Sequence, residues 1–271
     1  MATPATLDEF RGLFSESPDR RQWPHVATGI MYQRAMRELA ALLGCAPTEE
    51  AVYAHRCSTE ADAYAATLLR ATRTEWLLID DGFPPPGAGA SWKRMGELAA
   101  ARAAPVMRIE RVAEEGIVRG MGLAELRAHV RAQVTAARGR GHVGLKTIAA
   151  YRSGLGIGAA DAGAAADALR SGATRLEAKA LLDLLLVDAL EANAADPLPV
   201  QVHCGFGDPD LFLPGADPSL LAPIVERFAT TPFVLLHCYP FVRQASWLAH
   251  VYANVSSTCR SPSRTSGVRP R

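Results

Sequence analysis

The chain has 271 residues and a formal net charge of only +1, so it is long enough to bury a substantial core and shows no basic stripe for nucleic-acid binding. No aromatic-rich RNA motif is present either. A small molecule is therefore the favoured partner. The sequence is also compatible with a homo-oligomer. Only three of the 29 basic residues are lysines, so a lysine inside a strand is more informative than an arginine.

Cysteine usage and hydropathy favour the cytoplasm. The five cysteines form no C-x-x-C pair, which argues against a disulfide framework and for a reducing compartment. No signal-peptide pattern begins the chain, and no apolar stretch approaches the roughly 20 residues that span a bilayer. We expect a cytoplasmic protein without membrane contact.

The first third of the chain is predicted to be helical. Thr6 to Glu9 has the pattern of a capping box, and residues 25–43 have helical apolar spacing that Gly44 is placed to end. Further helices are expected after Thr48 and over residues 61–72. Residues 1–74 are therefore predicted to form a helical segment that packs on the remaining domain.

After residue 74 the pattern changes to strands that alternate with helices, as in βαβ units around a parallel sheet. The predicted strands are 75–80, 105–109, 142–148, 200–203 and 233–237, with a sixth beginning at 252–255. The predicted helices between them are 91–103, 122–138, 175–194 and 218–228.

Two α/β folds fit this order, an open doubly wound sheet and a (β/α)8 TIM barrel. The dinucleotide fingerprint is missing after the first strand, where Asp80 to Phe83 leads directly into prolines. The barrel is therefore the predicted fold, over residues 75–255.

His203 and His237 are the clearest site candidates, because each ends a predicted buried strand. The carboxyl ends of parallel strands meet at one edge of a sheet, so the two imidazoles are expected to converge. Imidazole suits zinc, manganese and similar divalent ions. The alternative is that each is a structural histidine hydrogen-bonded to a carbonyl group.

Lys146 lies in the apolar segment 142–148, one unit before His203. A lysine in a buried strand must be paired, neutralised or modified, because its desolvation is costly. The alternative is an exposed edge strand, which the following parallel units make less favourable.

The order Lys146, His203, His237 on successive strands resembles the metal-dependent amidohydrolase superfamily. The resemblance implies an H-x-H pair on strand one, a lysine or glutamate on strand four, histidines on strands five and six, and an aspartate on strand eight. If residues 75–80 are strand two, the three residues match strands four, five and six as metal ligands.

The neighbouring segments Trp76–Phe83, Gly144–Leu155 and Val202–Gly205 resemble the amidohydrolase-2 branch, which includes the nodulin-like domain fused to glutamine synthetase. The resemblance covers roughly residues 6–255. It implies a hydrolase for an amide or other C–N bond of a small carboxylated substrate, in which the metal activates water. Decarboxylase, lyase or isomerase chemistry of the same branch is the alternative, as is a non-catalytic ligand-binding remnant.

The sequence departs from the family pattern in two places. No H-x-H pair occurs, and the apolar pattern stops after Val255, so residues 256–271 are predicted to be a disordered tail. We hypothesise a shortened start and a frame shift near codon 256. The barrel is then expected to be incomplete, with strand one and strands seven and eight missing or altered, and the chain to be inactive as written.

Arg108, Tyr151 and Arg152 are candidate substrate-binding residues, since an arginine can bind a carboxylate through two parallel hydrogen bonds. Solvated arginines are the alternative. Asp80 and Asp81 follow a strand and could equally cap a turn. Cys204 and Cys238 adjoin the two histidines but are expected to serve packing on the opposite face.

Overall fold

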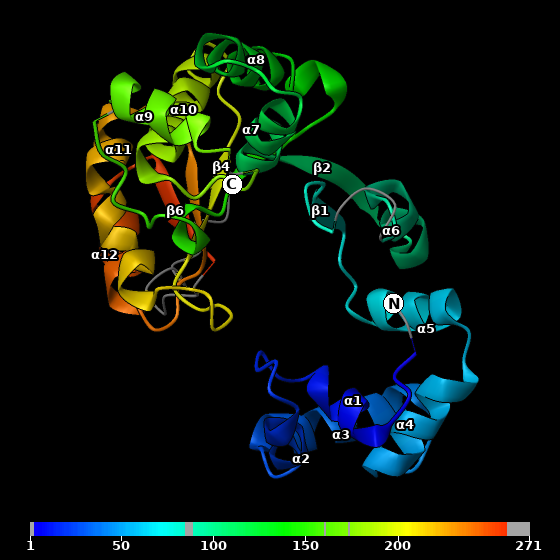
Figure 1. Ribbon diagram of the computed structural model, residues 1–271. Coiled ribbons are helices and arrows are strands. Elements are labelled where there is room, and N and C mark those ends of the chain that lie inside the picture. Colours follow the sequence, from blue (N-terminus) through cyan, green and yellow to red (C-terminus); the bar gives the residue numbers. More distant parts are fainter. Residues whose placement is uncertain (1–2, 85–88, 160, 173, 259–271) are drawn as a thin grey trace, which may run out of the picture. The chain divides into compact units, whose positions relative to one another are not determined.

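The computed structural model describes residues 3–84, 89–159, 161–172 and 174–258. The chain divides into two compact units (Figure 1). The first unit comprises Met1–Leu78 and Pro85–Ala104, and the second comprises Ile79–Pro84 and Pro105–Arg271.

The first unit is mainly helical. Its helices are α1 (Leu7–Gly12), α2 (Trp23–Val26), α3 (Ile30–Leu43), α4 (Glu49–Ser58), α5 (Ala61–Ala71) and α6 (Trp92–Ala99), with a 3-10 turn η1 (Arg20–Gln22). The predicted caps are confirmed: the Thr6 and Thr48 hydroxyls accept backbone N–H groups of α1 and α4. Gly44 ends α3 with a φ of 71°. The predicted helix 25–43 is interrupted before Ile30, because Gly29 is extended.

A small core holds the first unit together. It contains Phe10, Tyr32, Met36, Ala40 and Val52 from α1, α3 and α4. Tyr32 donates a hydrogen bond of 2.9 Å to Glu49, which also pairs with Arg11. This polar contact ties the three helices at the margin of the apolar cluster.

Strands and helices alternate through the rest of the chain. The strands are β1 (Trp76–Asp80), β2 (Arg102–Arg108), β3 (Gly144–Thr147), β4 (Val200–Cys204), β5 (Phe233–His237) and β6 (Val255–Ser257). The helices are α7 (Ile109–Val118), α8 (Leu123–Thr135), α9 (Ala162–Arg170), α10 (Lys179–Asn193), α11 (Ala222–Arg227) and α12 (Val242–Val251). Four 3-10 turns join them, η2 (Arg138–Arg140), η3 (Ala149–Tyr151), η4 (Leu213–Ala216) and η5 (Pro218–Leu221).

The strands form one sheet in chain order, β1 to β6, and β2 to β6 pair in parallel. Lys146 of β3 stands between Arg108 of β2 and Gln201 of β4 in the register. His203 of β4 is opposite Leu236 of β5. The carboxyl ends of these strands therefore lie along one edge of the sheet.

The prediction of an eight-stranded TIM barrel, even an incomplete one, is wrong. In the part of the chain that the structure describes, the sheet has six strands and is open, with β1 and β6 at its two edges. A barrel requires its first and last strands to pair, and this pairing is absent from the described sheet. The α/β class is confirmed. Of the predicted tail, Ser256 and Ser257 belong to β6, and 259–271 lie outside the described residues.

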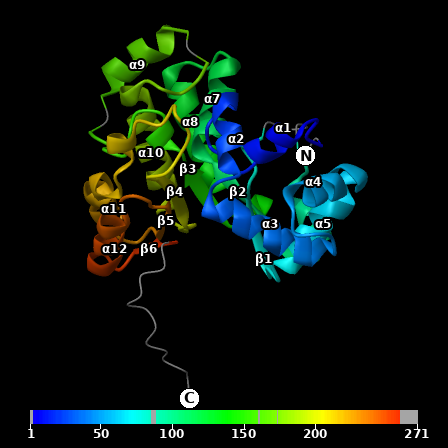
Figure 2. The ribbon, with the colours of Figure 1, turned by 90° about the horizontal axis from the view of Figure 1, so that it is seen from below.

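Helices α7, α8, α10, α11 and α12 lie on one side of strands β3 to β6 (Figure 2). Side chains that face these helices, such as Leu145, Val202 and Leu235, are fully buried. Their strand neighbours on the opposite face, such as Lys146, Gln201 and Leu236, are only half-buried. Alternating burial therefore separates an apolar face from a face that carries polar groups.

Helix α10 is the centre of the helical layer, since every residue from Leu181 to Leu190 is buried. A helix that is apolar on all sides is typical of a core position. Its buried Asp188 accepts hydrogen bonds from two arginines of α8, Arg127 at 2.7 Å and Arg131 at 2.9 Å. No helix of the described segments combines the length and apolarity that a membrane crossing demands.

Replacing Leu185 of α10 by alanine should lower the free energy of unfolding by about 2–5 kcal/mol, because a fully buried leucine leaves a cavity. Urea denaturation measures the change. The control is Leu220→Ala, at a leucine that is 41% exposed, where the loss should stay below about 1 kcal/mol. Equal losses in the two variants would contradict the central position of α10.

Candidate metal-binding site

The structure brings His203 and His237 together at the carboxyl edge of the sheet. Their ring centroids are 4.5 Å apart, with an angle of 49° between the ring planes. His203 is the penultimate residue of β4, lies on the polar face and is buried, whereas His237 is the last residue of β5 and is exposed. Two imidazoles at this separation are close enough to serve one ligand.

Both imidazoles are held in the neutral form at pH 7. Burial, and then the neighbouring His237, lower the pKa of His203 to about 4. Partial desolvation of the ring, and then the Lys146 ammonium, lower the pKa of His237 below its usual value. A neutral imidazole has a lone pair that can bind a cation without first losing a proton.

The ring of His203 is oriented by the turn that follows it. Nε2 of His203 lies 2.8 Å from the carbonyl oxygen of Phe206. A carbonyl oxygen only accepts, so the proton of the neutral ring is on Nε2, and Nδ1 carries the lone pair. Tyr151 packs on the other side of the ring, with 4.6 Å between the centroids, and its hydroxyl accepts a hydrogen bond from the Asp208 N–H.

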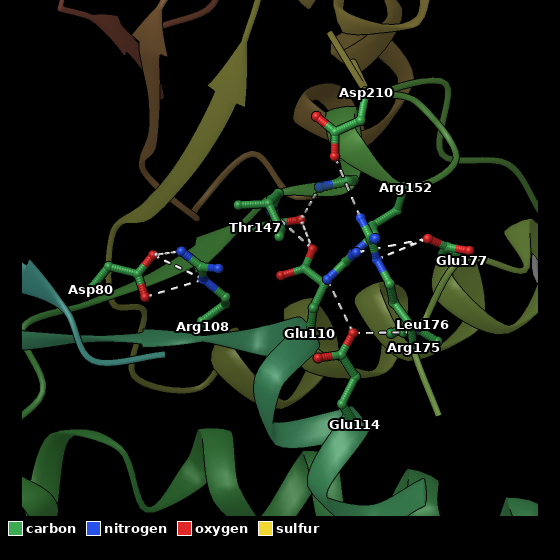
Figure 3. A network of polar contacts seen from close by, with 12 residues as sticks. Asp80, Arg108, Glu110, Glu114, Thr147, Arg152, Arg175, Leu176, Glu177 and Asp210 are labelled. Carbon is green, nitrogen blue, oxygen red and sulfur yellow. Dashed lines mark hydrogen bonds and ion pairs between the residues drawn. The ribbon is translucent and has the colours of Figure 1, made fainter. Parts of the chain in front are cut away.

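Lys146 is paired with a carboxylate that the sequence only weakly indicated. Its Nζ lies 3.2 Å from Oδ2 of Asp80, at the end of β1. The same carboxylate accepts hydrogen bonds from Nε, at 2.9 Å, and Nη2 of Arg108 (Figure 3). One carboxylate thus lies between two cations, which leaves one positive charge in excess. The sequence indicated this partner only by placing an acidic residue, Asp80, at the end of a predicted strand.

The described residues fit a metal ion in part. His203 and His237 could supply two neutral nitrogen ligands, which is half of a tetrahedral zinc shell. Among the residues that the structure describes, no group of three or more His, Cys, Asp or Glu side chains is placed to hold a metal. Lys146 influences both imidazoles electrostatically, while its ion pair is with Asp80.

The two arginines predicted to bind substrate are matched by carboxylates within the protein. Arg108 faces Asp80, and Arg152 donates to Glu114 at 3.1 Å and lies 4.0 Å from Glu177 (Figure 3). Their roles toward a substrate stay predictions. Tyr151, the third candidate, does lie beside His203.

Other residues near the strand ends have structural contacts. Cys204 and Cys238 are fully buried in the core, in agreement with a packing role. His142 has Nε2 at 2.8 Å from Oδ2 of Asp81. Asp81 is therefore paired separately from Asp80.

Glu110 of α7 is a buried carboxyl group that the sequence analysis missed. Its Oε1 accepts hydrogen bonds from the Thr147 hydroxyl and, at 3.0 Å, from the backbone N–H of Ile148, while Oε2 has no hydrogen-bond partner. These contacts fix the chain just after Lys146. Burial raises the pKa of Glu110 to about 7, against the opposing effect of the hydrogen bonds. Its position two residues after Arg108, in the first turn of a helix, gave no pattern that distinguished it from an exposed glutamate.

No family model matches this chain. Protein fluG of Emericella nidulans is 35% identical over 129 residues, which is 42% of this chain and only 15% of the length of fluG. The chain thus spans a small part of that relative. The crystal structure of a "putative metal-dependent hydrolase" from Lactobacillus casei is similar over 94% of this chain and 68% of its own, with a TM-score of 0.80 and 27% identity. The chain therefore shares the fold of that protein.

Replacing Glu110 by glutamine should change how stability depends on pH. The raised pKa means that the folded protein holds this proton between about pH 4.5 and 7 while the unfolded chain releases it, so its contribution to stability falls as the pH rises through that range. The total fall is about 3 kcal/mol. Glutamine keeps an acceptor for Thr147 and Ile148 but does not ionise.

Urea denaturation at pH 5, 6, 7 and 8 tests this, with the difference between wild type and Glu110→Gln isolating the one carboxyl group from the histidines. As the pH rises, the free energy of unfolding of the wild type should fall relative to that of Glu110→Gln. Parallel stability curves would show that Glu110 titrates normally.

Replacing Asp80 by asparagine should lower the free energy of unfolding by about 3 kcal/mol, because two largely buried cations lose their shared carboxylate. The matched control is Asp81→Asn, next in sequence and 37% exposed, for which a loss of about 1 kcal/mol or less is expected. Thermal and urea unfolding measure both variants. A smaller loss for Asp80→Asn than for Asp81→Asn would refute the pairing with Lys146 and Arg108.

Proposed function

We propose that this chain is a metal-dependent hydrolase whose divalent ion is bound by His203 and His237, with zinc as the first candidate and manganese as the second. The observation that carries the proposal is the contact between two neutral imidazoles at the carboxyl edge of a parallel sheet. Ligands bind at this edge in open α/β sheets. The similarity to the Lactobacillus casei structure supports the same class.

The residues around the imidazoles suit a small substrate with a carboxylate and an amide or other C–N bond. A bound divalent ion would lower the pKa of a water molecule and polarise a carbonyl group. Lys146 and Arg108 share the carboxylate of Asp80 and supply the excess positive charge that attracts a carboxylate. Tyr151 restricts the His203 ring and borders the place where a substrate would lie.

The finer assignment, to the amidohydrolase-2 branch and its nodulin-like relatives, belongs to the same proposal. Its support is the order Lys146, His203, His237 on β3, β4 and β5. In this branch Lys146 would be a third ligand. Since the 271 residues contain no H-x-H pair, turnover is expected to be slow or absent, and metal affinity is the more direct measurement.

Replacing either His203 or His237 by alanine should weaken zinc binding by at least about tenfold, since changes to groups that only support a ligand already cost 10–100-fold. Competition with a chromogenic chelator at pH 7 measures the affinity, and elemental analysis gives the stoichiometry. Manganese is titrated in parallel to decide between the two ions.

The matched control is His250→Ala, which removes an exposed histidine of α12 and should leave the affinity for zinc unchanged. The proposal fails if His203→Ala and His237→Ala both keep the zinc content and affinity of the wild type.

A further inference from the structure

The turns that follow the two histidines are hydrogen-bonded to each other through their backbones. The N–H of Cys238 donates to the carbonyl oxygen of Cys204 at 3.0 Å, and the N–H of Phe206 donates to that of Tyr239 at 2.6 Å. We call residues 204–206 and 237–239 the turn pair. Since His203 also contacts the carbonyl group of Phe206, both imidazoles are connected to the turn pair.

Gly205 lies at the closest approach of the two turns. Its φ is 69°, in the left-handed region that favours glycine. A Cβ atom at this position would lie 2.3 Å from the carbonyl oxygen of Tyr239 and 3.0 Å from the carbonyl carbon of Cys238. Both neighbours are backbone atoms, so a side chain at residue 205 would push the turns apart and break their hydrogen bonds.

The second turn holds an uncommon conformation. His237 and Cys238 have φ values of 64° and 65°, which residues other than glycine rarely adopt. Each is the central residue of a three-residue turn, with N–H to carbonyl hydrogen bonds from Cys238 to Leu236, 2.8 Å, and from Tyr239 to His237, 2.9 Å. Three-residue turns with a positive φ at the central residue are rare and strained, and they occur where neighbouring contacts hold them in place. The hydrogen bonds from the first turn provide such contacts.

This conformation decides where the His237 ring points. In the register, His237 is opposite Cys204, whose side chain is buried in the core with those of Val200 and Val202. Regular alternation would therefore direct His237 away from the face that carries His203. The two imidazoles are nevertheless in contact, because the chain leaves the strand conformation at His237.

We infer that Gly205 is a positioning residue: it allows the turn pair to close, and the closed turn pair places the His237 ring against His203. The expected effect of Gly205 on metal affinity rests on the proposed function. The expected effect of Gly205 on the contact between the two imidazole rings does not. Gly205 touches neither imidazole through a side chain and acts only through the backbone of residues 238 and 239.

The test compares Gly205→Ala with Gly139→Ala in the full chain. Gly139, in η2, has open space within 4 Å of where a methyl group would lie and no left-handed φ, so its substitution should be silent. In the metal-free protein, nuclear Overhauser contacts between the imidazole protons of His203 and His237 should be present in wild type and Gly139→Ala, and absent in Gly205→Ala. Unchanged amide shifts in β3 and α10 show that the fold is kept.

Zinc affinity then tests the consequence for the site. Gly205→Ala should weaken zinc binding by at least about tenfold, but should cause no further loss when His237 is already alanine. A purely structural role would lower the affinity equally in both backgrounds. If the wild type binds neither zinc nor manganese, the proposed function fails, and the inference about Gly205 is decided by the metal-free ring contacts.

Amide hydrogen exchange of the wild type covers the case in which Gly205→Ala does not fold. The N–H groups of Phe206 and Cys238 should be protected at least about 100-fold over unfolded rates, because both donate within the turn pair. Unprotected amides at these positions overturn the inference, as do retained ring contacts or wild-type zinc affinity in a folded Gly205→Ala variant.

Discussion

The register of β3, β4 and β5 is the constraint on which the site depends. It places Lys146 beside Gln201 and His203 beside Leu236, so that the polar side chains share one face while Leu145, Val202 and Leu235 share the other. A shift of one residue would exchange the two faces and bury the polar set against α10. The apolar packing of α10 therefore fixes which face of the sheet carries the polar side chains, in addition to stabilising the unit.

The strand ends carry a positively charged cluster beside two uncharged imidazoles. Asp80, between Lys146 and Arg108, satisfies two cations with one carboxylate, and the two imidazoles next to them are uncharged. Glu110 holds the chain just after β3 through its hydrogen bond with Ile148, without contributing a full charge near neutral pH. A cation would thus meet neutral nitrogen atoms, and an anion would meet the excess charge of Lys146 and Arg108.

Local patterns predicted the strands, because strand periodicity is a property of short segments. The common carboxyl edge of parallel strands predicted that His203 and His237 lie near each other, whereas regular alternation would turn their rings to opposite faces. Local patterns could not predict barrel closure, which depends on whether the first and last strands pair. The partner of Lys146 was also out of reach, since Asp80 is 66 residues earlier in the chain. The turned backbone at His237 could not be predicted from the sequence, because only a few per cent of residues other than glycine adopt a positive φ.

The left-handed backbone at His237 and Cys238 sets stability against the proposed metal site. Glycine adopts such a conformation without steric strain, so a screen for thermal stability alone would be expected to enrich glycine at both positions. At position 238 the gain would be limited by the lost packing of a buried side chain. At position 237 the more stable variant would have lost an imidazole, so that selection for heat resistance would erase the site while improving the fold.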